Sequence, residues 1–225
     1  MDKLTAIRNN RKTILSFDTH SNCKRNCPYC YVRAGQRRGG FTAVKKVSQY
    51  TYDHDLLRMK GRKQVKAIQK TGLRLFSFAD YRKKDQNMVK NVLGDCRELG
   101  LTAKAITKSF EFVRDFGDHP VIEIINLSVD SLMTQRELNL RESYQSKYDK
   151  VLLRCVILQD WDVPKFLDMN VDIFTFNHGI NGYFNYGSYK SHRNRVINYY
   201  GIRNETCGLT NTCLDCELQC GRYLL

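Results

Sequence analysis

A chain of 225 residues is long enough to bury one core and too short for two domains of full size. It contains no run of about 18 apolar residues, which excludes a membrane-spanning helix. The net charge of +14 points to an anionic partner such as a nucleic acid more than to a neutral metabolite. The first residues are basic but lack an apolar segment with a cleavage site, so we expect a cytoplasmic protein with no membrane partner.

The excess of positive charge is concentrated in two stretches of the sequence, at 58–70 and 189–203. The first combines Arg58, Lys60, Arg62, Lys63, Lys66 and Lys70. The second interleaves basic and aromatic side chains, namely Tyr189, Lys190, His192, Arg193, Arg195, Tyr199, Tyr200 and Arg203. Either stretch alone is equally typical of a solvated surface, whereas the two together favour contacts with phosphates.

Apolar, β-branched runs alternate with longer amphipathic stretches between the two ends of the chain. The runs predict six strands, at 13–18, 73–78, 102–107, 121–128, 150–158 and 171–177. The stretches between them predict helices at about 43–70, 84–99, 109–115, 131–147 and 162–168. This alternation is typical of βα units around a parallel sheet, and six such units indicate an α/β fold of the partial (βα)6, TIM-like barrel type. We expect the barrel to span residues 1–180 and a C-terminal cysteine-rich, metal-binding extension to span 181–225.

Polar residues follow the apolar bodies of most of the predicted strands. Functional groups of parallel βα folds gather at these carboxyl ends, although polar residues there also cap the helices that follow. Capping is the interpretation that we favour for Ser109 and Ser131. Thr175 and Asn177 instead alternate with phenylalanines inside a strand, so we expect both to face an interior cavity.

Three cysteines, Cys23, Cys27 and Cys30, lie within the segment SFDTHSNCKRNCPYCYVRAG, directly after the first predicted strand. A four-thiolate cluster or a structural zinc site uses four protein ligands, so a loop with three leaves one coordination position open for a substrate or cofactor. His20 is the alternative fourth ligand and would make a zinc site of three cysteines and one histidine. The spacing and the position after the first strand favour the cluster.

This segment resembles the signature of the radical SAM superfamily, CxxxCxΦC, in which Φ is aromatic and is here Tyr29. The resemblance implies that Cys23, Cys27 and Cys30 are the catalytic cysteines and hold a [4Fe-4S] cluster whose remaining iron binds S-adenosyl-L-methionine (SAM). Reductive cleavage of SAM would give methionine and a 5′-deoxyadenosyl radical that removes a hydrogen atom from the substrate. The superfamily places the loop after the first strand of a partial (βα)6 barrel, in agreement with the predicted elements. An electron donor such as flavodoxin or ferredoxin is the expected partner, and we expect a monomer.

The same resemblance implies where the cofactor lies. The motif after the second strand, which contacts the methionine amino group, is often Gly-Gly-Glu, and this chain has SFAD in its place. Asn126 and Ser128 would meet the ribose, and Arg154 would pair with the methionine carboxylate, although each is also compatible with ordinary packing. The predicted cofactor-binding residues are Tyr29, Ser77, Ala79, Asp80, Asn126, Ser128, Arg154 and Asn177.

The segment CGLTNTCLDCELQCG near the C-terminus contains four more cysteines, Cys207, Cys213, Cys216 and Cys220. Four ligands close a metal site, and many radical SAM proteins carry an auxiliary [4Fe-4S] cluster in such an extension. A structural zinc ion is the alternative, and either metal would contribute much of the folding energy of this segment. Cys96 and Cys155 stand apart from both clusters, and we interpret them as buried packing residues.

Two fragments resemble the spore photoproduct lyase-like branch of the superfamily: CPYCY, which contains Tyr31, and AITKS at 105–109. That branch repairs thymine dimers in DNA, and small radical SAM proteins of phages are similar too. With the positive charge, this favours a nucleic-acid substrate, in lesion repair or base modification. Two alternatives stay open: radical modification of a peptide or protein, and a non-catalytic, zinc-binding protein that binds nucleic acid.

Overall fold

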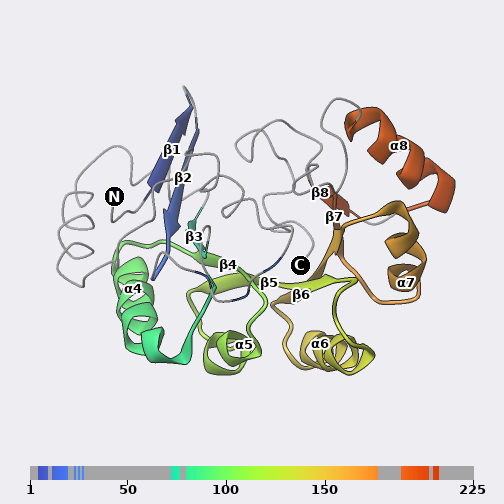
Figure 1. The fold of residues 1–225 in the computed structure, drawn as a ribbon. Coiled ribbons are helices and arrows are strands. Elements are labelled where there is room, and N and C mark those ends of the chain that lie inside the picture. The colour runs from blue at the N-terminus through green and yellow to red at the C-terminus, as the bar shows by residue number, and fades with distance from the viewer. Residues whose placement is uncertain are drawn as a thin grey trace. The chain divides into compact units, whose positions relative to one another are not determined.

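The computed structural model describes residues 5–9, 12–19, 23, 25, 27, 72–76, 80–176, 189–202 and 205–207. In these ranges the chain is an α/β protein in which strands and helices alternate (Figure 1). It forms two compact units: Met1–Arg25 with Thr42–Asn126, and Asn26–Phe41 with Leu127–Leu225. The division falls within strand β5 (Ile122–Asp130), which contributes to both units.

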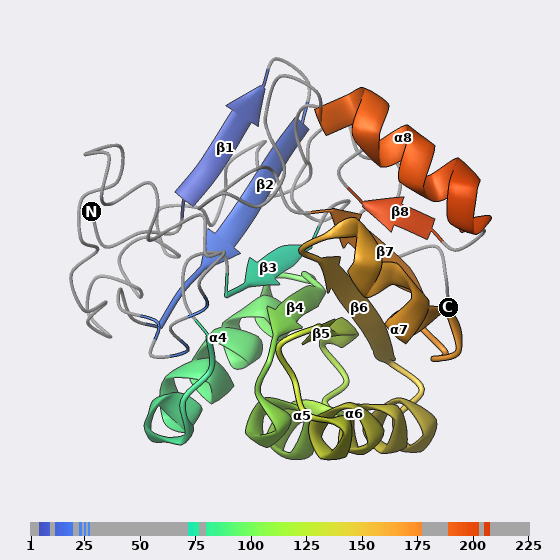
Figure 2. The same cartoon turned by 45° about the vertical axis from the view of Figure 1, so that its right-hand side comes forward.

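Unit 1 has the strand order β1-β2-β3-β4-β5. Its elements in chain order are β1 (Thr5–Asn9), β2 (Lys12–Phe17), β3 (Leu73–Leu75), the 3-10 helix η1 (Lys83–Asp85), α4 (Gln86–Glu98), β4 (Ala103–Thr107), α5 (Phe110–Phe116) and the first part of β5. β1 pairs with β2 in antiparallel orientation, whereas β2, β3 and β4 run parallel, with Leu15 opposite Leu73 and Leu73 opposite Ala103. Figures 1 and 2 both show α4 and α5 on one side of β3 and β4.

The helices of unit 1 bury apolar residues that recur at helical spacing and so lie on one face. These residues are Val89, Val92, Leu93 and Cys96 in α4, and Phe112, Val113 and Phe116 in α5. Phe17, Leu73 and Leu75 of the strands are equally buried. Complete burial of one such large side chain stabilises the fold by about 1.5–3 kcal/mol, so this core holds the strand ends in fixed positions.

Unit 2 has the strand order β5-β6-β7-β8. Its elements are the second part of β5, α6 (Gln135–Lys147), β6 (Val151–Ile157), η2 (Asp160–Asp162), α7 (Val163–Leu167), β7 (Ile173–Phe176), α8 (Tyr189–Tyr200) and β8 (Glu205–Cys207). β6, β7 and β8 run parallel, with Ile173 opposite Arg154 on one side and Glu205 on the other. The crossover from β7 to β8 through α8 repeats the βα pattern of the rest of the chain.

All six predicted strands are confirmed, as are the four predicted helices that fall on described residues. The predicted helix at 43–70 lies outside the described residues. Among the described strands and α-helices, β1, α8 and β8 were not predicted. Polar residues predominate in the sequences of β1 and β8, TAIRN and ETC. Among the α8 side chains that the structure describes, only Val196 is buried. This part of α8 therefore lacks the apolar stripe that predicts a surface helix.

Helix α6 begins at Gln135, four residues later than predicted, because Thr134 caps it. The Glu137 backbone N–H donates to Thr134 Oγ1 at 3.3 Å, and the Thr134 N–H donates to the Glu137 carboxylate at 2.9 Å. The prediction that Ser131 caps this helix is therefore wrong. The Ser131 carbonyl instead accepts a hydrogen bond from Lys165 Nζ.

We expect Thr134→Ala to lower the free energy of unfolding by about 1 kcal/mol, because it removes the cap, and Thr134→Ser to retain it. The hydrogen bonds from the Thr134 N–H and hydroxyl lower the pKa of Glu137. The lowered pKa belongs to the folded state, so the ionised Glu137 carboxylate stabilises the fold above the unfolded pKa of Glu137. This stabilisation is lost as the pH falls through the folded pKa. Urea unfolding at neutral and acidic pH measures both effects, and an equal loss in the serine and alanine variants would contradict the capping role.

Among the described helices, none combines the length and the hydropathy that crossing a membrane requires.

Candidate functional site

The candidate site of unit 1 is built at the carboxyl ends of β2, β3 and β4. Asp18 and Thr19 follow β2, Asp80 follows β3, and Thr107 ends β4, and all four are buried. The three strands are parallel neighbours, so their carboxyl ends meet at one edge. Buried polar side chains are therefore gathered where this class of fold places its functional groups.

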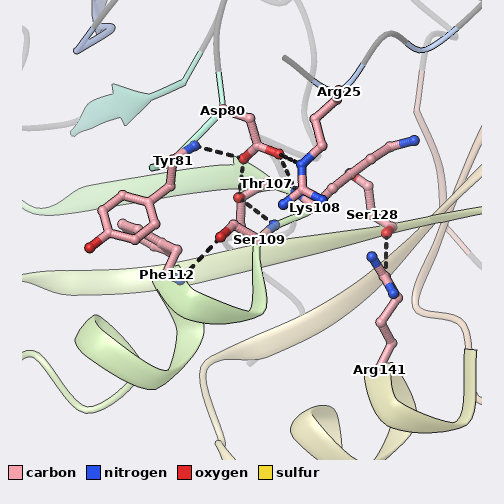
Figure 3. Close-up of polar contacts among 9 residues, drawn as sticks. All are labelled: Arg25, Asp80, Tyr81, Thr107, Lys108, Ser109, Phe112, Ser128 and Arg141. Atoms are coloured by element: carbon pink, nitrogen blue, oxygen red, sulfur yellow. Dashed lines mark hydrogen bonds and ion pairs between the residues drawn. The ribbon is translucent and has the colours of Figure 1, made fainter. Parts of the chain in front are cut away.

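Asp80 is the centre of the polar contacts at this edge (Figure 3). Its Oδ1 accepts hydrogen bonds from the Tyr81 N–H at 2.9 Å and from the Thr107 hydroxyl. Its Oδ2 accepts from Arg25 Nε at 2.9 Å and from the Lys108 N–H at 3.2 Å. The carboxylate thus joins three segments of the chain: the loop after β2, the loop after β3, and the end of β4.

The end of β4 continues this network into α5. Thr107 Oγ1 accepts a hydrogen bond from the Ser109 N–H at 2.9 Å, and Ser109 Oγ accepts one from the Phe112 N–H at 3.4 Å (Figure 3). Ser109 is the N-cap of α5, so the prediction that it caps this helix is confirmed. Asp80 is therefore linked through two hydroxyl groups to the start of a helix.

A second contact holds the residues directly after β2. Thr19 Oγ1 donates to Asp85 Oδ2 at 3.0 Å, and the same carboxylate accepts from Arg82 Nε at 2.8 Å and Nη2 at 3.2 Å. Asp85 belongs to η1, which leads into α4. The chain that follows β2 is therefore attached at two points to residues that follow β3: at Asp85 through Thr19 and at Asp80 through Arg25.

Phe76 follows β3 with a φ of 64°, in the left-handed region that bulky residues rarely adopt. Its ring lies 5.1 Å from that of Phe112 and 6.1 Å from that of Tyr81, measured between centroids. Such a backbone conformation costs about 1–3 kcal/mol and persists only where the surrounding structure determines it. The aromatic cluster of Phe76, Tyr81, Phe112 and Phe116 provides that constraint directly beside Asp80.

Tyr81 has a polar anchor at the end of its ring. Its hydroxyl donates to Asp115 Oδ2 at 2.7 Å, and Lys83 Nζ lies 2.7 Å from Asp115 Oδ1. Burial, and then the hydrogen bond to Asp115, raises the pKa of Tyr81 well above its usual value. Burial by itself raises the pKa of Asp115, but the hydrogen bonds from Lys83 and Tyr81 outweigh it and hold that pKa below its usual value. Tyr81 is therefore a neutral phenol with a structural role.

Two of the three cysteines of the first cluster, Cys23 and Cys27, fall on described residues, and both are half-buried. Their thiols are soft ligands that suit iron-sulfur clusters and zinc, so the donor set fits the predicted metal. Cys30, Tyr29 and His20 lie outside the described residues. Over the ranges that the structure does describe, no three His, Cys, Asp or Glu side chains are grouped as metal ligands.

The other predicted cofactor residues that the structure describes lie on β5 and β6. Asn126 and Ser128 are buried and, because strand side chains alternate, share one face of β5 with Asp130. Arg154 of β6 donates from Nε to Thr175 Oγ1 of β7 at 2.9 Å, so these two share a face. The Ser128 carbonyl accepts from Arg141 Nε of α6 at 3.0 Å (Figure 3).

Several predicted residues are not placed by the described part of the chain. Ser77, Ala79 and Asn177 lie outside it, as do Cys213, Cys216 and Cys220. Cys207 is the last residue of β8, so the C-terminal cluster begins where a strand ends.

The two isolated cysteines are core residues, as predicted. Cys96 lies on the buried face of α4, and Cys155 lies within β6. Burial, reinforced by the charge of Asp95, raises the pKa of Cys96 to about 12, and burial also raises the pKa of Cys155. Both thiols are therefore protonated and inert at neutral pH.

The sequence did not indicate the contact that Arg25 makes at this edge. Arg25 lies between Cys23 and Cys27, where the spacing pattern accepts any residue. The sequence could have indicated this ion pair only by a cation inside the cysteine loop and an aspartate after the next strand. These two residues are 55 positions apart in sequence. Comparison with protein-family models and with curated proteins found no match for the chain.

Proposed function

We propose that this chain is a radical SAM enzyme in which Cys23, Cys27 and Cys30 hold a [4Fe-4S] cluster and the substrate is a nucleic acid. When bound, the cluster supplies the electron that cleaves SAM, and the resulting 5′-deoxyadenosyl radical removes a hydrogen atom from the substrate. One observation carries the proposal. The cysteine loop directly follows β2, the first strand of the parallel series, and Asp80 joins this loop to the carboxyl end of β4.

We extend the proposal to the architecture: β2 to β7 would form the partial (βα)6 barrel of residues 1–180, with a metal-binding extension at 181–225. The presence of all six strands, in sequence order within each unit, supports it. In such a barrel one face of the strands points inward. The pairing of Arg154 with Thr175 favours this arrangement, since it sets both polar side chains on the face opposite Phe174 and Phe176.

The chain's own residues have distinct proposed roles. The cysteine thiolates hold the cluster and leave one iron without a protein ligand. Arg154 has five N–H donors, and the bond from Nε to Thr175 would orient its guanidinium for a bidentate pair with the methionine carboxylate. Asn126 and Ser128 would hydrogen-bond the ribose hydroxyls. Tyr29, Ser77, Ala79 and Asn177 complete the proposed cofactor site.

At the C-terminus, the four cysteines would hold an auxiliary [4Fe-4S] cluster or a zinc ion. Metal analysis of anaerobically reconstituted protein decides between them, since two clusters bring about eight irons and one cluster with zinc brings about four. The enzymatic part of the proposal is tested in the same sample by adding a reductant and SAM. Formation of 5′-deoxyadenosine supports it, and zinc without iron in the purified chain would reject it.

The proposed contact with nucleic acid is the exposed face of α8. Arg195 and Tyr199 are four residues apart, which places them on one side of the helix, and both are exposed, Tyr199 to 82%. A cation that neutralises a phosphate and a ring that stacks on a base are the combination that binds single strands. Both residues belong to the basic and aromatic stretch at 189–203.

We expect Tyr199→Ala to weaken binding of a labelled single-stranded oligonucleotide roughly five- to hundredfold, as loss of one stacking contact does. Arg195→Gln should reduce the slope of log affinity against log salt by about 0.7, the share of one phosphate contact. Fluorescence anisotropy at several salt concentrations measures both. The matched control is Trp161→Ala, which removes a ring that is 73% exposed on η2 and should leave binding unchanged. An unmodified chain with no affinity at low salt would rule out this substrate class.

A further inference from the structure

The Asp80 carboxylate is saturated by protein donors. Four hydrogen bonds reach it, two on each oxygen: from the Tyr81 N–H and Thr107 hydroxyl, and from Arg25 Nε and the Lys108 N–H. A carboxylate offers about four lone-pair sites. The side chain is 10% exposed, so water does not compete strongly for them. This environment is typical of a carboxylate that connects parts of the chain.

Three of the four donors fix Asp80 to rigid parts of unit 1. The backbone N–H groups of Tyr81 and Lys108 cannot change rotamer, and Thr107 is held in turn by the Ser109 N–H at the start of α5. The Tyr81 ring packs against Phe112 and Phe116. Asp80 is therefore an immobile acceptor, and its position does not depend on Arg25.

Arg25 is the donor that comes from the cysteine loop. It lies two residues from Cys23 and two from Cys27, and its side chain is 41% exposed. A side chain this exposed contributes little by packing, and its ion pair is partly screened by solvent. Its hydrogen bond from Nε to Asp80, at 2.9 Å, reaches across to the fixed end of β4.

We infer that Asp80 is a positioning residue that holds the cysteine loop, through Arg25, against the carboxyl end of β4. A loop fixed before the metal binds loses less conformational entropy when its thiolates become ligands, so metal is retained longer. The four hydrogen bonds to Asp80 all come from protein atoms. Only the effect on metal retention rests on the proposed function.

Hydrogen exchange of the full chain, purified without metal, tests the contact itself. Arg25→Gln removes the charge and the Nε donor at an exposed site, and we expect amide exchange in peptides spanning Cys23 and Cys27 to become about three- to tenfold faster. Lys83→Gln is the matched control. Lys83 is 49% exposed and pairs with Asp115 at 2.7 Å, also in unit 1, but is not bonded to Asp80. Unchanged exchange in Arg25→Gln, or equal acceleration in Lys83→Gln, would overturn the inference.

A double-variant cycle then shows whether Asp80 acts through Arg25. Asp80→Asn alone should accelerate exchange in the same peptides, and adding Arg25→Gln should produce no further acceleration, since both changes remove the contact between Arg25 and Asp80. Additive effects would mean that the two residues act independently and would overturn the inference. So would an Asp80→Asn variant with normal exchange and weakened SAM binding, because Asp80 would then contact the cofactor directly.

The consequence for metal is measured on reconstituted protein by the rate at which a chelator removes iron. We expect iron loss to be faster in Arg25→Gln than in Lys83→Gln. Arg25→Lys keeps the charge near Asp80, so its rate of iron loss should lie between those of Arg25→Gln and the unmodified chain. A chain that binds no iron but shows the expected exchange would reject the proposed function and leave the loop contact standing. Equal rates of iron loss in Arg25→Gln and Lys83→Gln would reject the role in metal retention.

Discussion

Replacing Cys27 with alanine is expected to abolish the formation of 5′-deoxyadenosine from SAM in reduced, reconstituted protein. The reaction needs three thiolates to hold the cluster and one iron without a protein ligand, and a loop with two thiolates cannot hold that arrangement. Cys27 is half-buried in the loop after β2, so the change leaves the apolar cores untouched. Chromatography of the nucleoside products, with the iron content of the same sample, measures the effect.

The matched control for this experiment is Cys96→Ala. It removes a thiol from the buried face of α4, where burial raises the cysteine pKa to about 12 and keeps the thiol protonated. We expect this variant to bind as much iron as the unmodified chain and to form the same product. Turnover that persists in Cys27→Ala would contradict the assignment of the loop, and loss of iron in Cys96→Ala would place a ligand where we find a core residue.

Phe112→Ala is expected to lower the free energy of unfolding by about 3–5 kcal/mol, which is the usual cost of removing a buried phenylalanine. Phe112 is fully buried, and its ring meets those of Phe76, Tyr81 and Phe116 at centroid distances of 5.1, 5.4 and 5.2 Å. The loss also releases the positive-φ backbone of Phe76 and the ring beside Asp80. Chemical unfolding followed by far-ultraviolet circular dichroism measures the change.

Phe112→Leu separates the contribution of the ring contacts to the free energy of unfolding from that of apolar burial alone. Leucine keeps most of the apolar volume but not the edge-to-face ring contacts, so we expect a loss of about 1–2 kcal/mol. If Phe112→Ala costs less than about 1 kcal/mol, the aromatic cluster does not hold the loop after β3 in place.

The strands that carry the candidate site could be predicted because their sequences are apolar at the right length. LRL in β3 and AKAIT in β4 have few polar residues, and their buried positions agree with that pattern. β1 and β8 have no such signal. TAIRN and ETC become strands because β2 and β7 present backbone groups for them to pair with, which no local pattern records.

The candidate site could be predicted in part for a related reason. The cysteine loop is local in sequence, so its spacing identifies its ligands. The contact between Arg25 and Asp80 joins positions 55 residues apart and exists only because β2, β3 and β4 are parallel neighbours. Sequence alone marked Asp80 as a cofactor residue. The four donors around its carboxylate are the basis for our inference that it also holds the loop.

The proposed function depends above all on an iron-sulfur cluster that is held by Cys23, Cys27 and Cys30 and binds SAM. Electron paramagnetic resonance of the anaerobic, reduced protein, recorded with and without SAM and accompanied by metal analysis, tests it most directly. We expect about four to eight irons per chain and the signal of a reduced [4Fe-4S] cluster that changes when SAM is added. A colourless protein that contains zinc and gives no such signal would contradict it.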